Sequence, residues 1–374
     1  MRTFVFALLL AVSAVSSLPV PNLVEYVKAK TYNISLDLPP EERWTEICSH
    51  YKSSASLLVK YLTKDLSPRL AQIIATVAGA LNKYLGEYGQ EMSGIAKAVG
   101  LPVGDIVGLN FAYELRKLGP GHPNTTGGSI GDEYTPQACT SIVAVDENDS
   151  LFHGRNMDWD MPNYLRNLTV LVNFHKGGKL LYTATTFAGY VGVMTAVKPG
   201  AYSVSLNERA LGGSTLVDIL SGALFGASAV THKLRQVFEE ESTYAGAIGA
   251  LSKGDVMAPA YFIIAGTKPG EGAVMTRDRD SVRDLWSLGT IHSNVQSWYI
   301  LETNYDHWES PPSFDDRRSY GVQFMNAMGR ESAASLNGIF TVLGRQPVNN
   351  NYTTYTALMN PAQGEITTYI VYGI

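Results

Sequence analysis

The spacing of apolar residues divides the chain into a helical first part and a strand-rich second part. Residues 23–118 are predicted to be mostly helical. Pro68 suits the start of one helix, because proline is favoured in the first helical turn. After it, apolar residues recur at three- and four-residue spacing from Leu70 to Leu85, and a second helix is expected over about 105–118. Such an apolar face usually packs on a core, and a face that touches a membrane is the alternative.

From Cys139 onward, β-branched and apolar runs alternate with short Gly-, Pro-, Asn- or Asp-containing turns, a pattern typical of strands. The expected strands cover 139–145, 151–156, 168–175, 179–187, 191–197, 201–206, 258–266, 272–277, 297–302, 352–359 and 365–371. Helices are expected over 215–225, 230–240, 244–251 and about 315–328. Strands, then helices, then strands predict an α+β fold with helices covering stacked antiparallel sheets.

A linker of turn-forming residues separates the two parts. Residues 119–136 read GPGHPNTTGGSIGDEYTP, which is rich in Gly, Pro and Thr. A segment of this composition predicts an exposed, protease-accessible loop. We therefore expect a mostly helical unit over 18–138 that ends in this linker and a second unit over 139–374.

The first 17 residues resemble a secretory signal peptide. Arg2 precedes a short apolar run over 4–12, and the small Ser17 suits cleavage before Leu18. Five N-x-S/T glycosylation sequons agree with this route: Asn33, Asn124, Asn148, Asn167 and Asn351. The mature protein is expected to be lumenal or extracellular, and we expect no nucleic-acid partner, because acidic residues outnumber basic ones 34 to 29 without a basic stripe.

Only two cysteines occur, Cys48 and Cys139, and either they pair or both are free. The seven histidines show no metal-ligand spacing, so neither a metal nor a cofactor is predicted. Cys139 lies where this linker, residues 119–136, gives way to the first expected strand of the second part. Cleavage before it would give one residue a nucleophilic sulfur and a free α-amine, which is a base with an ordinary pKa of ~7.7–8.0.

Several polar side chains could complete such a site. Arg155 and Asp158 follow Cys139 by one strand, a turn and a returning strand, so they are expected beside it, although a structural Arg–Asp pair would look the same. Asn304 is a candidate oxyanion donor. Glu208 and Arg317 lie in charged patches that a surface salt bridge or a helix start, with Asp315 or Asp316 as its cap, would also explain.

Five blocks of sequence together resemble the acid ceramidase and N-acylethanolamine-hydrolysing acid amidase family. They are CTSIVA from Cys139, HGRNMD from His153, FAGYVG from Phe187, NYD from Asn304 and DDRR from Asp315. YNISLDL from Tyr32, with Arg43-Trp44, resembles the family's α-subunit, and the match runs from about residue 30 to 370.

This resemblance implies an N-terminal-nucleophile hydrolase with an αββα sandwich and an α-subunit ahead of a catalytic β-subunit. It implies a lysosomal precursor, with secretion as a further destination, that cuts itself between Ala138 and Cys139 into two chains. Cys139 then matches the nucleophile, Arg155 and Asp158 the groups that position its sulfur and amine, and Asn304 the oxyanion-side asparagine. In the same way, Glu208 and Arg317 match polar residues that line the site. The implied substrate is a long-chain lipid amide held at a membrane or vesicle surface.

The blocks are divided between the two branches. The short segment over 155–170, the YDHW that begins at Tyr305 and the end at Ile374 resemble the amidase, whereas SLNER from Ser205 and LDLPP from Leu36 resemble the ceramidase. We expect N-acylethanolamine hydrolysis, with ceramide hydrolysis as the alternative. The rivals are the same fold acting on bile-salt or penicillin-like amides, and a non-enzymatic glycoprotein with a Cys48–Cys139 disulfide.

Overall fold

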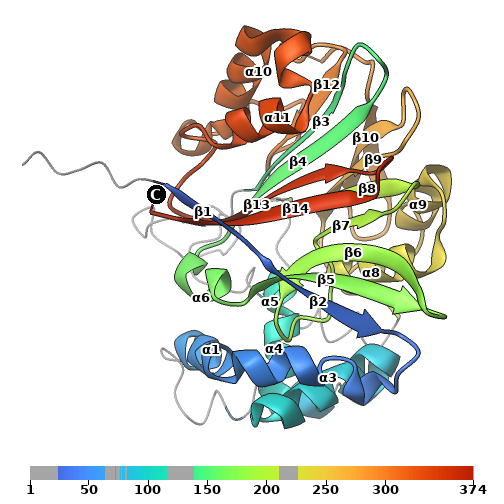
Figure 1. Ribbon diagram of the computed structural model, residues 1–374, viewed down its shortest axis with the longest axis vertical. Helices are drawn as coiled ribbons and strands as arrows, with labels where there is room; N and C mark the ends of the chain where they lie inside the picture. Colours follow the sequence, from blue (N-terminus) through green and yellow to red (C-terminus); the bar gives the residue numbers. More distant parts are fainter. Residues whose placement is uncertain are drawn as a thin grey trace, which may run out of the picture.

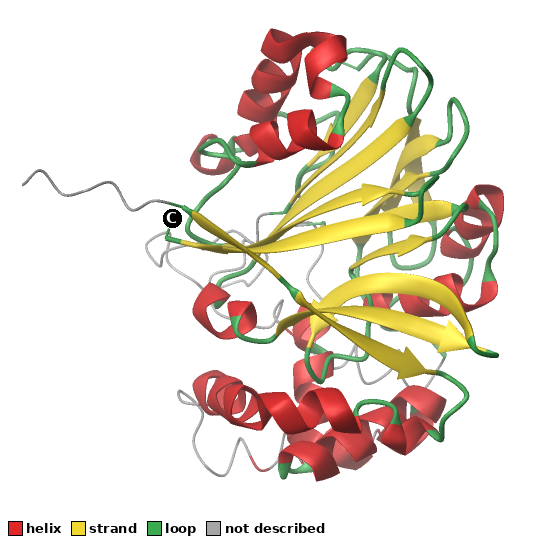
Figure 2. Ribbon diagram, viewed as in Figure 1, coloured by secondary structure: helices red, strands yellow, loops and turns green. Residues whose placement is uncertain are grey.

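The frame of the molecule is a pair of β-sheets packed face to face, with helices on their outer faces (Figures 1 and 2). The computed structural model describes residues 24–115 apart from 64–71, 73–75, 77 and 81, and then residues 139–209, 226–292 and 294–373. Within these residues the predicted α+β, αββα architecture is confirmed.

One sheet has six strands and carries the start of the second unit. Its order is β1 (Glu25–Lys28), β14 (Glu365–Tyr372), β13 (Thr353–Asn360), β4 (Leu151–Asp158), β3 (Thr140–Val145) and β12 (Tyr299–Glu302), all antiparallel. Helices α10 (Arg317–Ala333) and α11 (Leu336–Leu343) lie against its outer face (Figure 1). Gly154 permits this packing, because a Cβ there would collide with Ile339 of α11.

The other sheet has eight strands. Its order is β11 (Val282–Ser287), β10 (Gly272–Arg277), β9 (Ala260–Ala265), β8 (Tyr202–Glu208), β7 (Thr195–Lys198), β6 (Lys179–Phe187), β5 (Thr169–Lys176) and β2 (Lys30–Ser35). The β2–β5 pair is parallel and the other pairs are antiparallel. Further α-helices within the described residues are α8 (Val230–Glu240), α9 (Tyr244–Leu251), α6 (Pro162–Arg166) and, from the first unit, α1 (Thr45–Thr63), α3 (Gly86–Val99), α4 (Val103–Asn110) and α5 (Ala112–Leu115).

The central strands are buried on both faces. Every residue of β3, β8, β9, β10 and β13 is buried. β3 lies between the eight-stranded sheet and α10, β13 between that sheet and α11, and β9 between the six-stranded sheet and α9, so the usual alternation of buried and exposed residues disappears there. Polar side chains on these strands therefore lie in the interior, where they need partners.

The first unit differs most from its prediction, because it begins with strands. β1 extends the six-stranded sheet beside β14, and β2 extends the eight-stranded sheet beside β5. Both are short edge strands with largely exposed side chains, so they lack the buried apolar run that marks a strand in sequence. The expected helix after Pro68 lies largely outside the described residues, as do the linker 119–136 and the helix expected over 215–225.

Other differences are local. The helix expected over 105–118 is two helices, α4 and α5, interrupted at Phe111, and the strand expected over 191–197 shortens to β7. In the second unit, three strands or α-helices of the described residues were not predicted, α6, β11 and α11. Asp316 is the N-cap of α10, accepting a hydrogen bond from Ser319 N–H, which agrees with one of the two expected caps. Among the described residues, no helix is long and apolar enough to span a membrane.

Candidate active site

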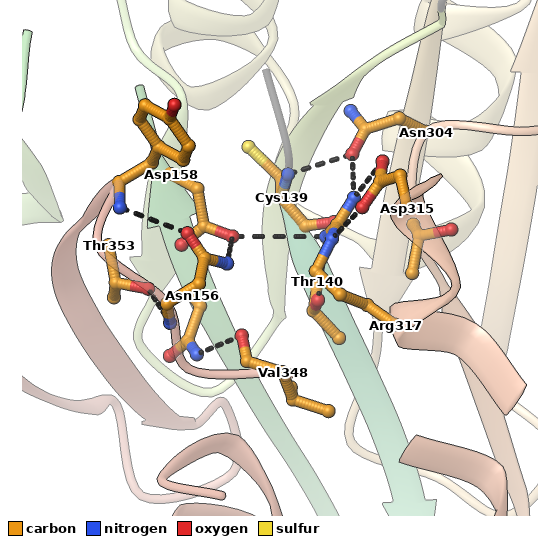
Figure 3. A network of polar contacts seen from close by, with 12 residues as sticks. Cys139, Thr140, Asn156, Asp158, Asn304, Asp315, Arg317, Val348 and Thr353 are labelled. Carbon is orange, nitrogen blue, oxygen red and sulfur yellow. Dashed lines mark hydrogen bonds and ion pairs between the residues drawn. The ribbon is translucent and has the colours of Figure 1, made fainter. Parts of the chain in front are cut away.

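Cys139 lies at the head of β3, in the middle of a buried polar network (Figure 3). Only 5% of the residue is exposed. Its backbone N–H donates to Asn304 Oδ1 at 2.8 Å, and its carbonyl oxygen accepts from Arg317 Nη1 at 2.7 Å. The sulfur points away from Asn304 and lies 3.8 Å from Met157 Sδ. The backbone on both sides of the Cys139 α-carbon is thus held by side chains.

Arg317, at the start of α10, holds the carbonyl side of this cysteine. Besides the Cys139 carbonyl, its guanidinium donates to Thr140 Oγ1 at 3.0 Å and to Asn304 Oδ1 at 3.0 Å. Asp315 accepts the other two N–H groups, at 2.6 and 2.9 Å. All five guanidinium donors are therefore used, which fixes the fork completely.

Asn304 follows β12 and faces the amide side of the cysteine. Its Oδ1 accepts from Cys139 N–H, while its Nδ2 donates to the Glu208 carbonyl at 2.8 Å. This places the amide oxygen, rather than the NH₂ group, against the nitrogen that cleavage would free. Glu208, the last residue of β8, thus contributes a backbone contact that orients Asn304.

Arg155 lies on β4, directly across from Ser141 of β3, as the hairpin spacing predicts. It is fully buried between the sheets. Its Nη1 donates to Thr195 Oγ1 at 2.7 Å and its Nη2 donates to the Leu206 carbonyl at 3.1 Å, so it is anchored to the opposite sheet. Burial raises the pKa of the Cys139 thiol, and the nearby Arg155 charge opposes that rise.

Asp158 ends the same strand and is also buried. Its Oδ2 accepts from Asn350 Nδ2 at 3.1 Å and lies 3.8 Å from Arg317 Nη1, whereas Oδ1 has no hydrogen-bond partner among the described residues. Burial raises the pKa of Asp158 to about 6, against the attraction of Arg317. An unused buried acceptor beside Cys139 is suited to hold an amine.

An apolar cavity of about 40 Å³ lies close to this network. Its walls come from both units: Ala55, Leu58, Leu62, Leu109 and Ala112 from the first, and Trp159, Met161, Leu165, Leu168, Phe187, Ala188, Gly189 and Tyr190 from the second. Trp159 directly follows Asp158, which brings one wall beside the polar site. The lining is suited to hydrocarbon, and the free volume is too small for a long acyl chain without side-chain movement.

The two cysteines do not pair. Cys48 and Cys139 are both buried and free, which contradicts the disulfide-linked glycoprotein alternative. Four of the five sequons lie within the described residues, and Asn33, Asn148, Asn167 and Asn351 are exposed there. Asn124 lies outside the described residues, as do residues 1–17 and Ala138.

Some contributors were not foreseen. Asn350 was not among the candidate residues, although its amide donates to Asp158. Asn207 links the sheets: it accepts from Ser141 Oγ at 2.9 Å and donates to the Glu302 and Thr303 carbonyls at 3.0 Å each, just before Asn304. Polar residues at every second position of β8, Ser203, Ser205 and Asn207, were the available signal, because they place one polar stripe on one face of the strand.

Two family models match the chain. Residues 139–330 match the linear amide C–N hydrolases of the choloylglycine hydrolase family, and residues 27–85 match the "beta subunit of N-acylethanolamine-hydrolyzing acid amidase". That description letters the subunits oppositely to the α and β used above, so we call the two parts the N-terminal and C-terminal chains.

Curated relatives match nearly the whole length. Acid ceramidase of Pan troglodytes is 34% identical over 360 residues, covering 91% of this chain and 85% of the relative. N-acylethanolamine-hydrolyzing acid amidase of Rattus norvegicus is 34% identical over 335 residues, covering 89% of this chain and 86% of the relative. A solved Caenorhabditis elegans ortholog of that amidase is 38% identical, with a TM-score of 0.53, covering 60% of this chain and 93% of that one.

These matches and the sandwich fold define an amide hydrolase of the N-terminal-nucleophile type. The chain belongs to the choloylglycine hydrolase family of linear amide carbon–nitrogen hydrolases, and within it is similar to acid ceramidase and N-acylethanolamine-hydrolyzing acid amidase. Its equal identity to these two relatives does not separate their substrates.

Proposed function

We propose that this protein is a cysteine amidase that hydrolyses N-acylethanolamines to a fatty acid and ethanolamine, after it has cleaved itself between Ala138 and Cys139. The observation that carries the proposal is the pair of contacts on the Cys139 backbone. Asn304 accepts from its nitrogen and Arg317 donates to its carbonyl, so the residue is held for chemistry at its N-terminal side.

In the precursor, the Cys139 sulfur attacks the Ala138 carbonyl carbon. The peptide C–N bond breaks, the Cys139 nitrogen takes the thiol proton, and a thioester remains. Water then hydrolyses this thioester: its oxygen joins the Ala138 carbonyl carbon, the C–S bond breaks, the sulfur takes a proton from the water, and two chains are released. The freed amine keeps the place of the peptide nitrogen, where Asn304 Oδ1 accepts one hydrogen and the unused Asp158 Oδ1 accepts another.

In the mature enzyme, the α-amine takes the thiol proton while the sulfur attacks the lipid amide carbon. The protonated amine gives that proton to the departing ethanolamine nitrogen as the C–N bond breaks. Water hydrolyses the acyl-cysteine that remains. Arg155 stabilises the developing thiolate by charge, since it opposes the pKa rise that burial imposes on Cys139. The resemblance implies an oxyanion role for Asn304, whereas the orientation of its amide favours holding the amine.

The apolar cavity supports a hydrocarbon acyl group as substrate. A lipid surface as transient partner is supported by α1, where Leu62 lines the cavity and Leu57 is 56% exposed. We propose an acidic lumen, the lysosome above all, as the place of action. The raised pKa of Asp158, about 6, then keeps this buried carboxyl neutral in the precursor.

Ceramide hydrolysis is the second candidate, because acid ceramidase is as similar to the chain as the amidase is. The deciding experiment gives the self-cleaved enzyme a panel of N-acylethanolamines, ceramides and bile-salt conjugates that share one acyl length. The proposal predicts the largest kcat/KM for the ethanolamide, a covalent acyl-enzyme by intact mass, and neither result for Cys139→Ala. Preference for ceramide would replace our first candidate with the second, and turnover by Cys139→Ala would refute both.

A further inference from the structure

One wall of the apolar cavity is a tight turn in the C-terminal chain. Phe187, Ala188, Gly189 and Tyr190 all line the cavity, and we call residues 187–192 the cavity turn. A hydrogen bond from Tyr190 N–H to the Phe187 carbonyl, at 2.8 Å, closes it. The position of this turn fixes how much room an acyl chain has.

Asn110, at the end of α4 in the N-terminal chain, holds the backbone of the cavity turn at two points. Its Nδ2 donates to the Gly189 carbonyl at 3.0 Å, and its Oδ1 accepts from Val191 N–H at 2.7 Å. The Asn110 side chain is fully buried, and Nδ2 also donates to the Ile106 carbonyl of its own helix at 2.9 Å. The amide is therefore fixed to α4 and transmits the position of that helix to the turn.

Glu91, in α3 of the N-terminal chain, acts on the same turn through Arg235. Arg235 Nη1 donates to the Val191 carbonyl at 2.9 Å. Glu91 fixes the guanidinium by two bonds, at 2.6 and 2.7 Å, and both side chains are fully buried. Glu91 also accepts from Arg43 at 2.9 Å and from Trp44 at 2.7 Å.

Gly189 places the cavity turn beside the helices of the N-terminal chain. Its φ is +89°, a left-handed conformation that favours glycine. A Cβ at this position would lie 3.4 Å from Ile95 and 3.9 Å from the sulfur of Cys48, both in N-terminal helices. Both distances are ordinary van der Waals contacts, so the hydrogen bonds from Asn110 and Arg235, and not close packing at Gly189, hold the turn here.

We infer that Asn110 and Glu91 are positioning residues through which the N-terminal chain sets the acyl-chain selectivity of the enzyme. The inference rests on the proposed function, because it concerns how a lipid acyl group is accommodated. After cleavage, these contacts hold the turn from a separate chain. Loosening them should affect long acyl chains, which fill the cavity, and spare short ones.

The test compares Asn110→Ala with Asn82→Ala as a matched control. Asn82 is also in the N-terminal chain, and its Nδ2 makes two donations at 2.8 Å, to Gly89 and Ser93, away from the cavity turn. Both purified, self-cleaved enzymes hydrolyse 4-carbon and 16-carbon acyl amides of one fluorogenic amine. We expect Asn110→Ala to lose about tenfold in kcat/KM for the long substrate, mainly through KM, because methylene burial is impaired. The short substrate should change less than about twofold, and Asn82→Ala should keep the wild-type ratio.

An unchanged long-to-short ratio in folded Asn110→Ala would overturn the inference. Should this variant not fold, Asn110→Asp keeps the acceptor for Val191 N–H. It should lower the long-to-short ratio of kcat/KM by less than Asn110→Ala would. A wild-type ratio in Asn110→Asp would again overturn the inference. Hydrogen exchange in the wild type gives an independent check, because the Val191 amide should be as protected as the core of β6. Rapid exchange of the Val191 amide would contradict the claim that Asn110 holds the cavity turn. A wild type that hydrolyses no acyl amide would instead refute the proposed function.

Discussion

Replacing Arg317 by lysine keeps a positive charge at the site but removes the planar guanidinium and its five fixed N–H donors. The five guanidinium N–H groups bind the Cys139 carbonyl, Thr140, Asn304 and both oxygens of Asp315. A lysine ammonium has three donors and cannot reproduce the planar fork. The contacts to Cys139 and Asn304 therefore cannot both survive together with the Asp315 pair.

The expected loss follows from those two contacts. A hydrogen bond that involves a charged group contributes about 1.5–3 kcal/mol, and about 1.4 kcal/mol is tenfold in rate. Losing one contact slows the reaction about tenfold to 150-fold, and losing both slows it up to about 10⁴-fold. Because Arg317 is almost fully buried, solvent screening reduces these values little.

Self-cleavage is followed by gel electrophoresis of acidified precursor, and turnover by release of fatty acid. Arg330→Lys is the matched control: Arg330 is in the same helix, and its guanidinium donates to the Val145 carbonyl at 3.0 Å and the Asp146 carbonyl at 2.6 Å, at the far end of β3. We expect this control to process and turn over at close to the wild-type rate. Arg317→Lys rates within about threefold of wild type would refute the reasoning, since even one lost contact predicts more.

Three further predictions concern Glu302, Cys48 and Leu57. Burial raises the pKa of Glu302 to about 8, whereas the unfolded chain loses this proton near the ordinary pKa of 4.5. Between these two pH values the folded state must keep a proton that the unfolded state releases. The free energy of unfolding is therefore highest below about pH 4.5 and falls as the pH rises towards 8. Thermal melts should show a higher Tm at pH 5 than at pH 8, and Glu302→Gln should flatten this dependence. Cys48→Ala should keep self-cleavage and turnover, because Cys48 is free, and a folded variant that loses both would contradict this prediction. Leu57→Glu should slow hydrolysis of vesicle-bound substrate but not of a soluble one, whereas Leu285→Glu, also an exposed leucine, should change neither; equal losses on both substrates would exclude a membrane role for α1.

The parts of the site that the sequence predicts are those held by local geometry. A short turn between β3 and β4 places Arg155 opposite Ser141, so the proximity of Arg155 to Cys139 follows from strand pairing alone. Asn304 and Arg317 lie 165 and 178 residues beyond Cys139, and no local pattern reveals that they meet it. Family resemblance supplied these two residues as candidates.

The orientation of groups was beyond sequence reasoning. Asn304 was expected to stabilise an oxyanion, yet the Glu208 carbonyl engages its NH₂ group and turns its oxygen towards Cys139. Residues 25–35 were included in a helical region because edge strands need bury little to remain paired. Asn350 was missed because its contact with Asp158 depends on the start of β13 lying beside the end of β4.

The most direct test of the account is N-terminal sequencing of purified precursor after incubation at acidic pH, beside a Cys139→Ala control. The account predicts a new chain that begins at Cys139 in the wild type and an intact precursor in the variant. A wild type that gains activity without such a chain, or a Cys139→Ala variant that is still cut before residue 139, would contradict it.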